Sequence, residues 1–364
     1  MEYILIIFIL QFIFGQLIQN LNSKPFTLFF DVIAFGLVLL FSIGITYTAD
    51  WQMYYWFYKI EYDETDYAFY WLSIYFADHG YSYEALFQFH IIVISVLNYI
   101  LIKKFSFNYF YIIITYYVVN YVHAVNQIRY FMGFPLILLG FHYLIQKNNW
   151  LVAIPLFILS YLCHSALMVL LIFIPIYRIP TKHYIKFVFF GALATTIVIY
   201  TVLKLKLGDA LDHFGAYFGK EFNSSFMGGL FNALPYLIYY TFLIIESNKL
   251  LKNNPHYYED KNFQFLHKIS FFPLVFVFAS FFVQILGHRY VLPFVIFWNI
   301  YYLYLIKDLS TNRRSLKLAL FGIVHIIVVC CFYIFPDFVL KENHYVLELV
   351  DMLKSDKILK EIFF

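Results

Sequence analysis

Apolar residues in this sequence come in runs that are long enough to cross a lipid bilayer. Crossing the hydrocarbon core takes about 20 residues of helix. Of the 364 residues, 63% are hydrophobic and 13% are charged, whereas a soluble domain typically carries about 25% charged residues. The polar side chains are therefore too few to cover the surface of a soluble globule of this size. The sequence predicts an all-α, polytopic integral membrane helix bundle.

The apolar runs divide the chain into about twelve expected spans, each near membrane length. In order, they are 3–18, 26–46, 84–102, two within 105–145, two within 150–177, 186–202, 230–245, 269–287, 290–306 and 318–335. The runs 105–145 and 150–177 are too long for one crossing. We therefore divide them at their polar interruptions, near 125–128 and at Cys163-His164-Ser165.

The spans form one expected transmembrane domain, residues 1–335. The polar segments 47–83 and 204–229 are its outer segments, and the extracytoplasmic loops are expected to form a cavity. The tail, 336–364, repeats apolar residues at the spacing of one helix face. These residues are Val346, Leu349, Val350 and Leu353. The tail is therefore predicted to be an amphipathic helix that lies on the membrane surface.

Lysine and arginine in short loops indicate which side of the membrane each loop occupies. If the spans alternate from the first, one side receives Lys24, Lys103, Lys104, Lys147, Arg178, Lys182, Lys186, Lys249, Lys252, Lys261, Lys268, Arg313, Arg314 and Lys317. The opposite side receives the acidic segment with Asp50, Glu61, Asp63, Glu64, Asp66 and Asp78. The basic side is predicted to be cytoplasmic, and both termini then fall outside. This alternation requires the division of both long runs, which supports the two divisions.

Motifs for nucleotide, metal or redox chemistry are missing from the sequence. It contains no P-loop, no GxGxxG, no HExxH and no nucleophile elbow. The three cysteines, Cys163, Cys330 and Cys331, lie in apolar runs without CxxC or Cys/His ligand spacing. We therefore expect no disulfide framework, no metal site and no cofactor.

Five polar residues from distant parts of the chain approach the predicted outer face: Asp50, Glu84, Arg129, His164 and Arg289. An arginine near apolar helix ends is costly, by about 2.5–3.5 kcal/mol at the bilayer centre and less near the interface. Its planar fork of donors matches phosphate oxygens. Arg129 and Arg289 could therefore hold a diphosphate at the membrane surface. The alternative is that each arginine extends from a helix end to the interface.

The candidate proton-transfer groups are His164, Asp50 and Glu84. Histidine has a reference pKa near neutrality, so His164 can act as a base or an acid; a histidine at a helix junction can also be structural. Asp50 and Glu84 flank the first outer segment, where a carboxylate either accepts a proton from a hydroxyl or is simply solvated. Asp31, inside the second expected span, is either a packing hydrogen-bond acceptor or a transport carboxylate, and we favour packing.

Aromatic residues near these groups suit stacking against sugars. They include Trp51 and Tyr54 in the first outer segment, and Tyr130 and Tyr290, each directly after an arginine. An interfacial aromatic belt is the alternative explanation for the outer-segment cluster. His288-Arg289-Tyr290 is similarly either a polar cap on a helix hairpin or part of an anion site.

These pieces, taken in sequence order, resemble the EpsG-type, Wzy-like polysaccharide polymerases. The matching stretches are Thr48-Ala49-Asp50 with Tyr54, Gly80-Tyr81-Ser82-Tyr83-Glu84-Ala85-Leu86-Phe87, Ile128-Arg129-Tyr130, Tyr143-Leu144-Ile145-Gln146-Lys147, Leu162-Cys163-His164-Ser165-Ala166-Leu167 and His288-Arg289-Tyr290. The pattern covers about residues 45–305. Each motif is short, and the ordered set carries the resemblance.

The resemblance implies a multi-pass glycosyltransferase of the bacterial inner membrane, with its active site on the extracytoplasmic side. It would transfer a growing glycan from undecaprenyl diphosphate to a sugar hydroxyl of another lipid-linked repeat unit. His164, Asp50 and Glu84 would be catalytic. Arg129, Arg289 and His288 would bind the diphosphate, and Trp51, Tyr54, Tyr130 and Tyr290 would contact substrate. A flippase and a chain-length regulator are implied as partners, and nucleic acid is not.

Other functions are compatible with the same residues. An O-antigen-ligase-like transferase uses the same donor with a different acceptor. A transporter or flippase of a lipid-linked glycan would need charges deep in several spans, and only Asp31 is clearly a deep carboxylate. A membrane-bound acyltransferase also uses a histidine in apolar surroundings, but it does not need two arginines on the outer face.

Overall fold

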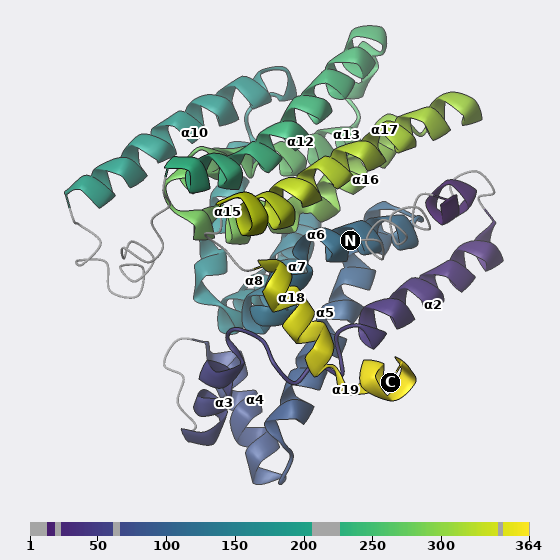
Figure 1. Cartoon of the computed structure of the whole chain (residues 1–364). Helices are drawn as coiled ribbons and strands as arrows, with labels where there is room; N and C mark the ends of the chain where they lie inside the picture. The colour runs from purple at the N-terminus through teal and green to yellow at the C-terminus, as the bar shows by residue number, and fades with distance from the viewer. Residues whose placement is uncertain (1–12, 19–22, 61–65, 206–225, 341–344, 364) are drawn as a thin grey trace. The chain divides into compact units, whose positions relative to one another are not determined.

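The computed structural model describes residues 13–18, 23–60, 66–205, 226–340 and 345–363. Every regular element in these ranges is helical (Figure 1), which confirms the predicted all-α class. The chain divides into two compact units. Among the described residues, the first unit comprises those within Ile13–Ile172 and Tyr345–Phe364, and the second comprises those within Phe173–His344.

Five described helices are long and apolar enough to cross a membrane. They are Tyr83–Phe105, Ile128–Gln146, Thr181–Lys204, Met227–Asn253 and Thr311–Phe335. The predicted count of about twelve spans is not confirmed, because other expected spans are shorter or interrupted helices. Most of the first expected span, 3–18, and most of the outer segment 204–229 lie outside the described residues.

The first unit contains helices from both ends of the chain. They are α2 (Lys24–Leu40), α3 (Trp51–Ile60), α4 (Tyr67–Asp78), α5 (Tyr83–Phe105), α6 (Tyr109–Asn126), α7 (Ile128–Phe141), η1 (His142–Gln146), α8 (Trp150–Cys163), η2 (Ser165–Ile172), α18 (Tyr345–Ser355) and α19 (Lys357–Phe363). Helix α7 packs against α5 and α8. At Gly133 the α7 backbone approaches α8 so closely that an added Cβ would lie 3.0 Å from the Ser160 carbonyl oxygen.

Both long apolar runs are interrupted at the predicted positions. Gln127 separates α6 from α7. His164 has an extended backbone, φ −163° and ψ 114°, between α8 and η2. Each interruption leaves backbone N–H and C=O groups at the helix ends without a helical hydrogen-bond partner, and polar residues can bond to these groups. The two breaks therefore set the positions of Arg129 and His164 in the first unit.

The second unit is built from α9 (Phe173–Tyr177), α10 (Thr181–Lys204), α12 (Phe226–Asn253), η6 (Pro255–Tyr258), α13 (Lys261–Phe271), α14 (Leu274–Val277), η7 (Ala279–Phe281), α15 (Gln284–Tyr290), η8 (Leu292–Phe294), α16 (Val295–Leu305), α17 (Thr311–Val329) and η9 (Cys330–Leu340). The expected spans 269–287 and 290–306 are not continuous helices. Helix breaks occur beside Pro273 and Pro293, because proline lacks the backbone N–H that helix continuation needs.

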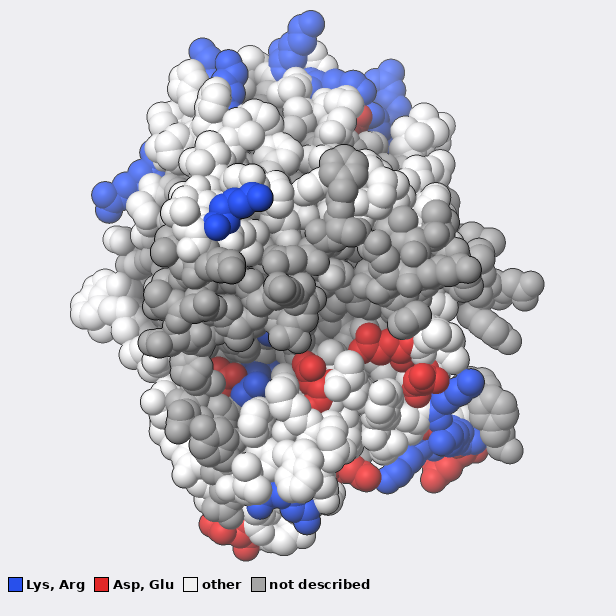
Figure 2. All heavy atoms as spheres, turned by 60° about the vertical axis from the view of Figure 1, so that its left-hand side comes forward, with Lys and Arg blue, Asp and Glu red and all other residues white. Residues whose placement is uncertain are grey.

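Basic side chains gather at the upper end of the view in Figure 2, the end at which α12 finishes and α17 begins in Figure 1. Glu246, near the end of α12, lies between Lys249, at 3.2 Å, and Lys317 of α17. Lys249 and Lys317 belong to loops that the sequence assigns to the cytoplasmic side, and that side stays a prediction.

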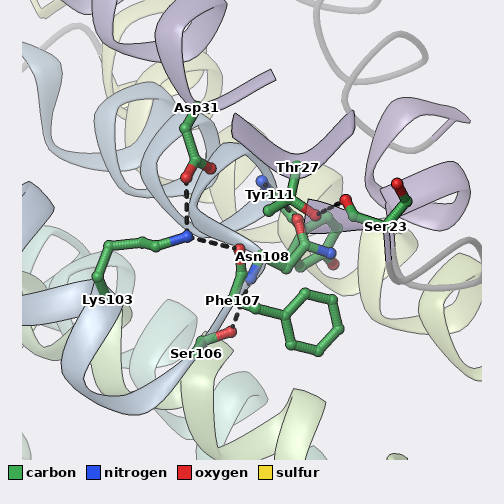
Figure 3. Close-up of polar contacts among 8 residues, drawn as sticks. All are labelled: Ser23, Thr27, Asp31, Lys103, Ser106, Phe107, Asn108 and Tyr111. Carbon is green, nitrogen blue, oxygen red and sulfur yellow. Dashed lines mark hydrogen bonds and ion pairs between the residues drawn. The ribbon is translucent and has the colours of Figure 1, made fainter. Parts of the chain in front are cut away.

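Asp31 of α2 forms a buried ion pair with Lys103, near the end of α5 (Figure 3). Its Oδ2 atom lies 2.7 Å from Lys103 Nζ, which also donates a hydrogen bond of 3.2 Å to the Phe107 carbonyl. The Asp31 side chain is 3% exposed, and that of Lys103 is 29% exposed. The contact ties α2 to α5 and supports the packing interpretation of Asp31.

We predict that Asp31→Ala lowers the free energy of unfolding by about 1–3 kcal/mol, because it leaves Lys103 without its counter-charge and Lys103 is only partly solvated. Thermal unfolding of the purified protein in detergent measures this. Asp31→Leu combined with Lys103→Met should recover most of the loss, and Lys104→Met, on the exposed neighbouring lysine, serves as the control. Unchanged stability of Asp31→Ala would contradict the packing role.

The C-terminal tail docks onto the segment between α2 and α3. The Lys357 N–H donates to the Gly44 carbonyl at 2.8 Å, and the Thr46 hydroxyl donates to the Ser355 carbonyl at 2.9 Å. Asp356 Oδ1 accepts the N–H groups of Ile358 and Leu359, which caps α19. Burial raises the pKa of the Asp356 carboxyl above its usual value, although these hydrogen bonds oppose the shift. The predicted amphipathic tail is thus folded against the first unit.

Gly44 is required for this docking, because an added Cβ would lie 2.1 Å from Asp356 Oδ1. We predict that Gly44→Ala displaces the tail, whereas Gly36→Ala, where a Cβ meets nothing within 4 Å, does not. Thiol labelling of Met352→Cys, a buried tail position, in a protein without its native cysteines measures the displacement. Faster labelling with Gly44→Ala alone is the expected result, and equal labelling of both glycine variants would refute it.

Candidate functional site

A buried ion pair lies at the start of α7. Arg129 Nη1 is 2.9 Å from Asp66 Oδ2, and the two side chains are 12% and 3% exposed. The Arg129 guanidinium also lies over three aromatic rings, at 4.7 Å from Tyr54, 5.5 Å from Phe69 and 5.6 Å from Phe57. Such contacts favour a desolvated cation. The arginine is therefore held in one orientation by a carboxylate and by aromatic faces.

The local sequence explains why this arginine needs a carboxylate. The break at Gln127 places Arg129 in the first turn of α7, where the positive end of the helix dipole disfavours a cation. Asp66, directly before the first residue of α4, supplies the opposite charge. In the sequence, Asp66 is only one of several acidic residues in the outer segment. No short-range sequence pattern pairs Asp66 with Arg129, because the contact joins the starts of two helices that are far apart along the chain.

Asp50 and Trp51 are also in this part of the first unit. The Asp50 N–H donates to Asn126 Oδ1 at 2.7 Å, which fixes the start of α3 at the break between α6 and α7. The Trp51 ring lies 4.8 Å from that of Tyr83 and 5.0 Å from that of Phe87. Helices α3 and α4 thus lie beside the first turns of α5 (Figure 1).

Tyr130, which follows the Gln127 break in α7, lies next to His164. Their rings are 5.5 Å apart, and Tyr130 is fully buried. The Ala166 N–H donates to His164 Nδ1 at 3.3 Å. Because that amide can only donate, Nδ1 holds a lone pair, and a neutral His164 carries its proton on Nε2. In this arrangement His164 is a hydrogen-bond donor at Nε2.

Glu84 is engaged by the tail. Its Oε2 atom lies 2.7 Å from Lys357 Nζ, and its side chain is 43% exposed. Surface pairs of this kind contribute little to stability. The structure therefore places Glu84 at the docking contact of α19, whereas Asp66 is the carboxylate that meets Arg129.

The predicted residues His288, Arg289 and Tyr290 lie in α15 of the second unit. His288 and Tyr290 are buried, and the Tyr290 ring lies 5.0 Å from that of Phe276. Arg289 occupies the last turn of α15, where the helix dipole favours a cation. That Arg289 converges with Arg129 on one ligand stays a prediction.

This arrangement is suited to binding an anion. A guanidinium has five donors in a planar fork, so it can hold a carboxylate and phosphate oxygens together. The Tyr54 and Phe69 rings that cover the guanidinium are themselves buried. Among the residues that the structure describes, no group of three His, Cys, Asp or Glu side chains is placed to hold a metal ion. The arginine can stabilise negative charge, and His164 can transfer a proton.

We predict that Asp66→Ala lowers the free energy of unfolding by about 3 kcal/mol, because it leaves a buried arginine without its counter-charge. Asp78→Ala, at the exposed end of the same helix, should change stability by less than about 0.5 kcal/mol. Asp66→Leu with Arg129→Met should recover stability without recovering activity. Chemical unfolding measures all three, and equal stability of the two single variants would contradict the pairing.

Comparison with known proteins identifies the family. The model of the EpsG family matches residues 28–347, which include both arginines and His164. Searches of the curated proteins and of the solved structures gave no match. The match covers most of the chain and confirms the resemblance seen in the ordered motifs. The chain therefore belongs to the EpsG family.

Proposed function

We propose that this protein is a polysaccharide polymerase that extends a glycan at the outer leaflet of the bacterial inner membrane. Its donor is a growing chain on undecaprenyl diphosphate, and its acceptor is a sugar hydroxyl of another lipid-linked repeat unit. Membership of the EpsG family is consistent with a polysaccharide polymerase. The donor, the acceptor and the side of the membrane belong to the proposal.

The observation that carries the proposal is the orientation of Arg129. In the reaction, the acceptor oxygen attacks the anomeric carbon, and the bond from that carbon to the diphosphate breaks. Negative charge then accumulates on the leaving diphosphate. A guanidinium that is already held in place by Asp66 and Tyr54 stabilises this charge without reorganising. The lipid diphosphate supplies the activated bond, so the protein needs no nucleotide site.

The aromatic side chains of α3 fit the other half of the substrate. Trp51 and Tyr54 both lie on α3; the Trp51 ring contacts that of Tyr83, and the Tyr54 ring covers the Arg129 guanidinium. Tyrosine and tryptophan rings present an apolar face together with a polar edge. We propose that these residues hold sugar rings next to the diphosphate. A flippase that delivers the repeat units and a regulator of chain length are the partners that such a polymerase would need.

We predict that Arg129→Ala lowers polymerisation by about 10²-fold or more, as expected for the loss of a group that stabilises transition-state charge. Arg129→Lys should retain part of the activity, because it keeps the charge and loses the fork. The measurement is the formation of glycan ladders by the purified protein from a lipid-linked repeat unit. Arg289→Ala is expected to behave like Arg129→Ala.

The control for these variants is Arg178→Ala, an exposed arginine in a loop assigned to the cytoplasmic side. It should form ladders at the wild-type rate. Ladders of normal length and rate from folded Arg129→Ala would remove this residue from the mechanism. Transfer to a different acceptor without ladders would identify a ligase-type transferase instead.

A further inference from the structure

His90 is a buried histidine on α5 whose protonation is fixed by its local structure. Its Nδ1 atom lies 2.8 Å from the carbonyl oxygen of Leu86, one helical turn earlier. A carbonyl oxygen can only accept, so Nδ1 carries the proton and Nε2 of the neutral ring holds a lone pair. Nε2 is buried and has no hydrogen-bond partner. The ring therefore presents an unused proton acceptor.

A second unused polar group lies on the same face of the helix. Tyr83 precedes His90 by seven residues, which brings both side chains to one face of α5. The Tyr83 hydroxyl is also buried and makes no hydrogen bond. Leaving a buried polar group unpaired is costly, so each such group needs an explanation, and a role in catalysis is one of them.

Both groups border the Arg129 site. Phe69 lies 5.6 Å from the His90 ring and 5.5 Å from the Arg129 guanidinium, so one side chain separates the two. Tyr54 contacts both Phe69, at 5.5 Å, and Arg129, at 4.7 Å. The Tyr83 ring lies 4.8 Å from that of Trp51 and 5.9 Å from that of Tyr58, both on α3, the helix that also supplies Tyr54. The unpaired acceptor therefore adjoins the candidate diphosphate site.

Two of the other candidate bases, His164 and Glu84, are placed differently. His164 uses the Nδ1 lone pair for the Ala166 N–H, which leaves a donor at Nε2. Glu84 is paired with Lys357 of the tail. Of these three side chains, His90 alone combines a buried position beside Arg129 with a lone pair that no protein group uses.

We propose that His90 Nε2 is the general base that accepts the proton of the acceptor hydroxyl, and that the Tyr83 hydroxyl binds the same sugar. This role rests on the polymerase function proposed above. The acceptor O–H bond breaks as its oxygen forms a bond to the anomeric carbon, and the proton passes to His90 Nε2. The bond from the anomeric carbon to oxygen of the diphosphate breaks, and its electron pair leaves with the diphosphate, next to Arg129. The substrate hydroxyl occupies the hydrogen-bonding position that is unfilled at Nε2.

The test uses the full-length protein with a lipid-linked repeat unit as both donor and acceptor. In His90→Gln, the amide can still accept a hydrogen bond but cannot take the proton. We expect kcat to fall by about 10²-fold, within the range for general-base catalysis, while KM changes little. Added imidazole should restore part of the rate to His90→Ala, because a free base can enter the vacated space.

His325 provides a matched control in the second unit. It is buried, its Nδ1 contacts the Phe321 carbonyl at 2.7 Å, and its Nε2 also lacks a partner. The His325 ring packs against Tyr239 and Phe321. The His90 ring, by contrast, packs against Phe69, which also contacts Arg129. If catalysis depends on the position of the histidine beside Arg129, and not on its burial alone, His325→Gln should keep the wild-type kcat.

The outcomes separate the two proposals. Absence of ladders with the folded wild-type protein overturns the polymerase function. Ladders from wild-type and His90→Gln at the same kcat overturn the role of His90 and leave the function standing. An equal loss in His90→Gln and His325→Gln, or a loss in His90→Ala that imidazole does not reverse, also overturns it. If His90→Gln does not fold, His90→Asn replaces it, because its shorter amide can still donate to the Leu86 carbonyl.

Discussion

The arrangement of the first unit depends on the buried ion pair between Arg129 and Asp66. An arginine in the first turn of a helix is opposed by the helix dipole, and in an apolar environment it also loses hydration. Asp66 offsets both costs from the start of α4, and Tyr54 and Phe69 cover the guanidinium. The pair therefore ties α4 and α3 to α7. The positive charge of Arg129 therefore takes part both in the packing of these helices and in the candidate function.

Two interruptions of long apolar runs bring the chemically useful groups to helix ends. A continuous helix would bury its backbone groups in internal hydrogen bonds and would leave polar side chains in the apolar interior. At Gln127 and His164 the chain leaves helical geometry. At these breaks side chains accept hydrogen bonds from backbone groups: Asn126 Oδ1 accepts the Asp50 N–H, and His164 Nδ1 accepts the Ala166 N–H. The contact at the Gln127 break joins distant segments, whereas the one at His164 is local.

The two histidines beside this site differ in what their backbone neighbours allow. A carbonyl acceptor at Nδ1 of His90 leaves a lone pair at Nε2, and an amide donor at Nδ1 of His164 leaves a proton there. Equivalent side chains are therefore suited to opposite proton-transfer roles. Together with Arg129, they would provide a base, a donor and a fixed positive charge.

The sequence by itself determined the all-α class, both helix breaks and the family, because hydropathy, helix interruptions and ordered motifs are local properties of the chain. It also singled out Arg129, Asp50 and His164, since charged or polar residues stand out in apolar runs. It did not predict that expected spans such as 269–287 are broken, although Pro273 was visible there. Only the tertiary structure decided that Arg129 meets Asp66, that Glu84 meets the tail, and that His90 rather than His164 presents a lone pair. These contacts depend on how the helices are rotated and packed against one another. The sequence did not predict them, because the spacing of residues along one helix does not specify which other helix packs against it.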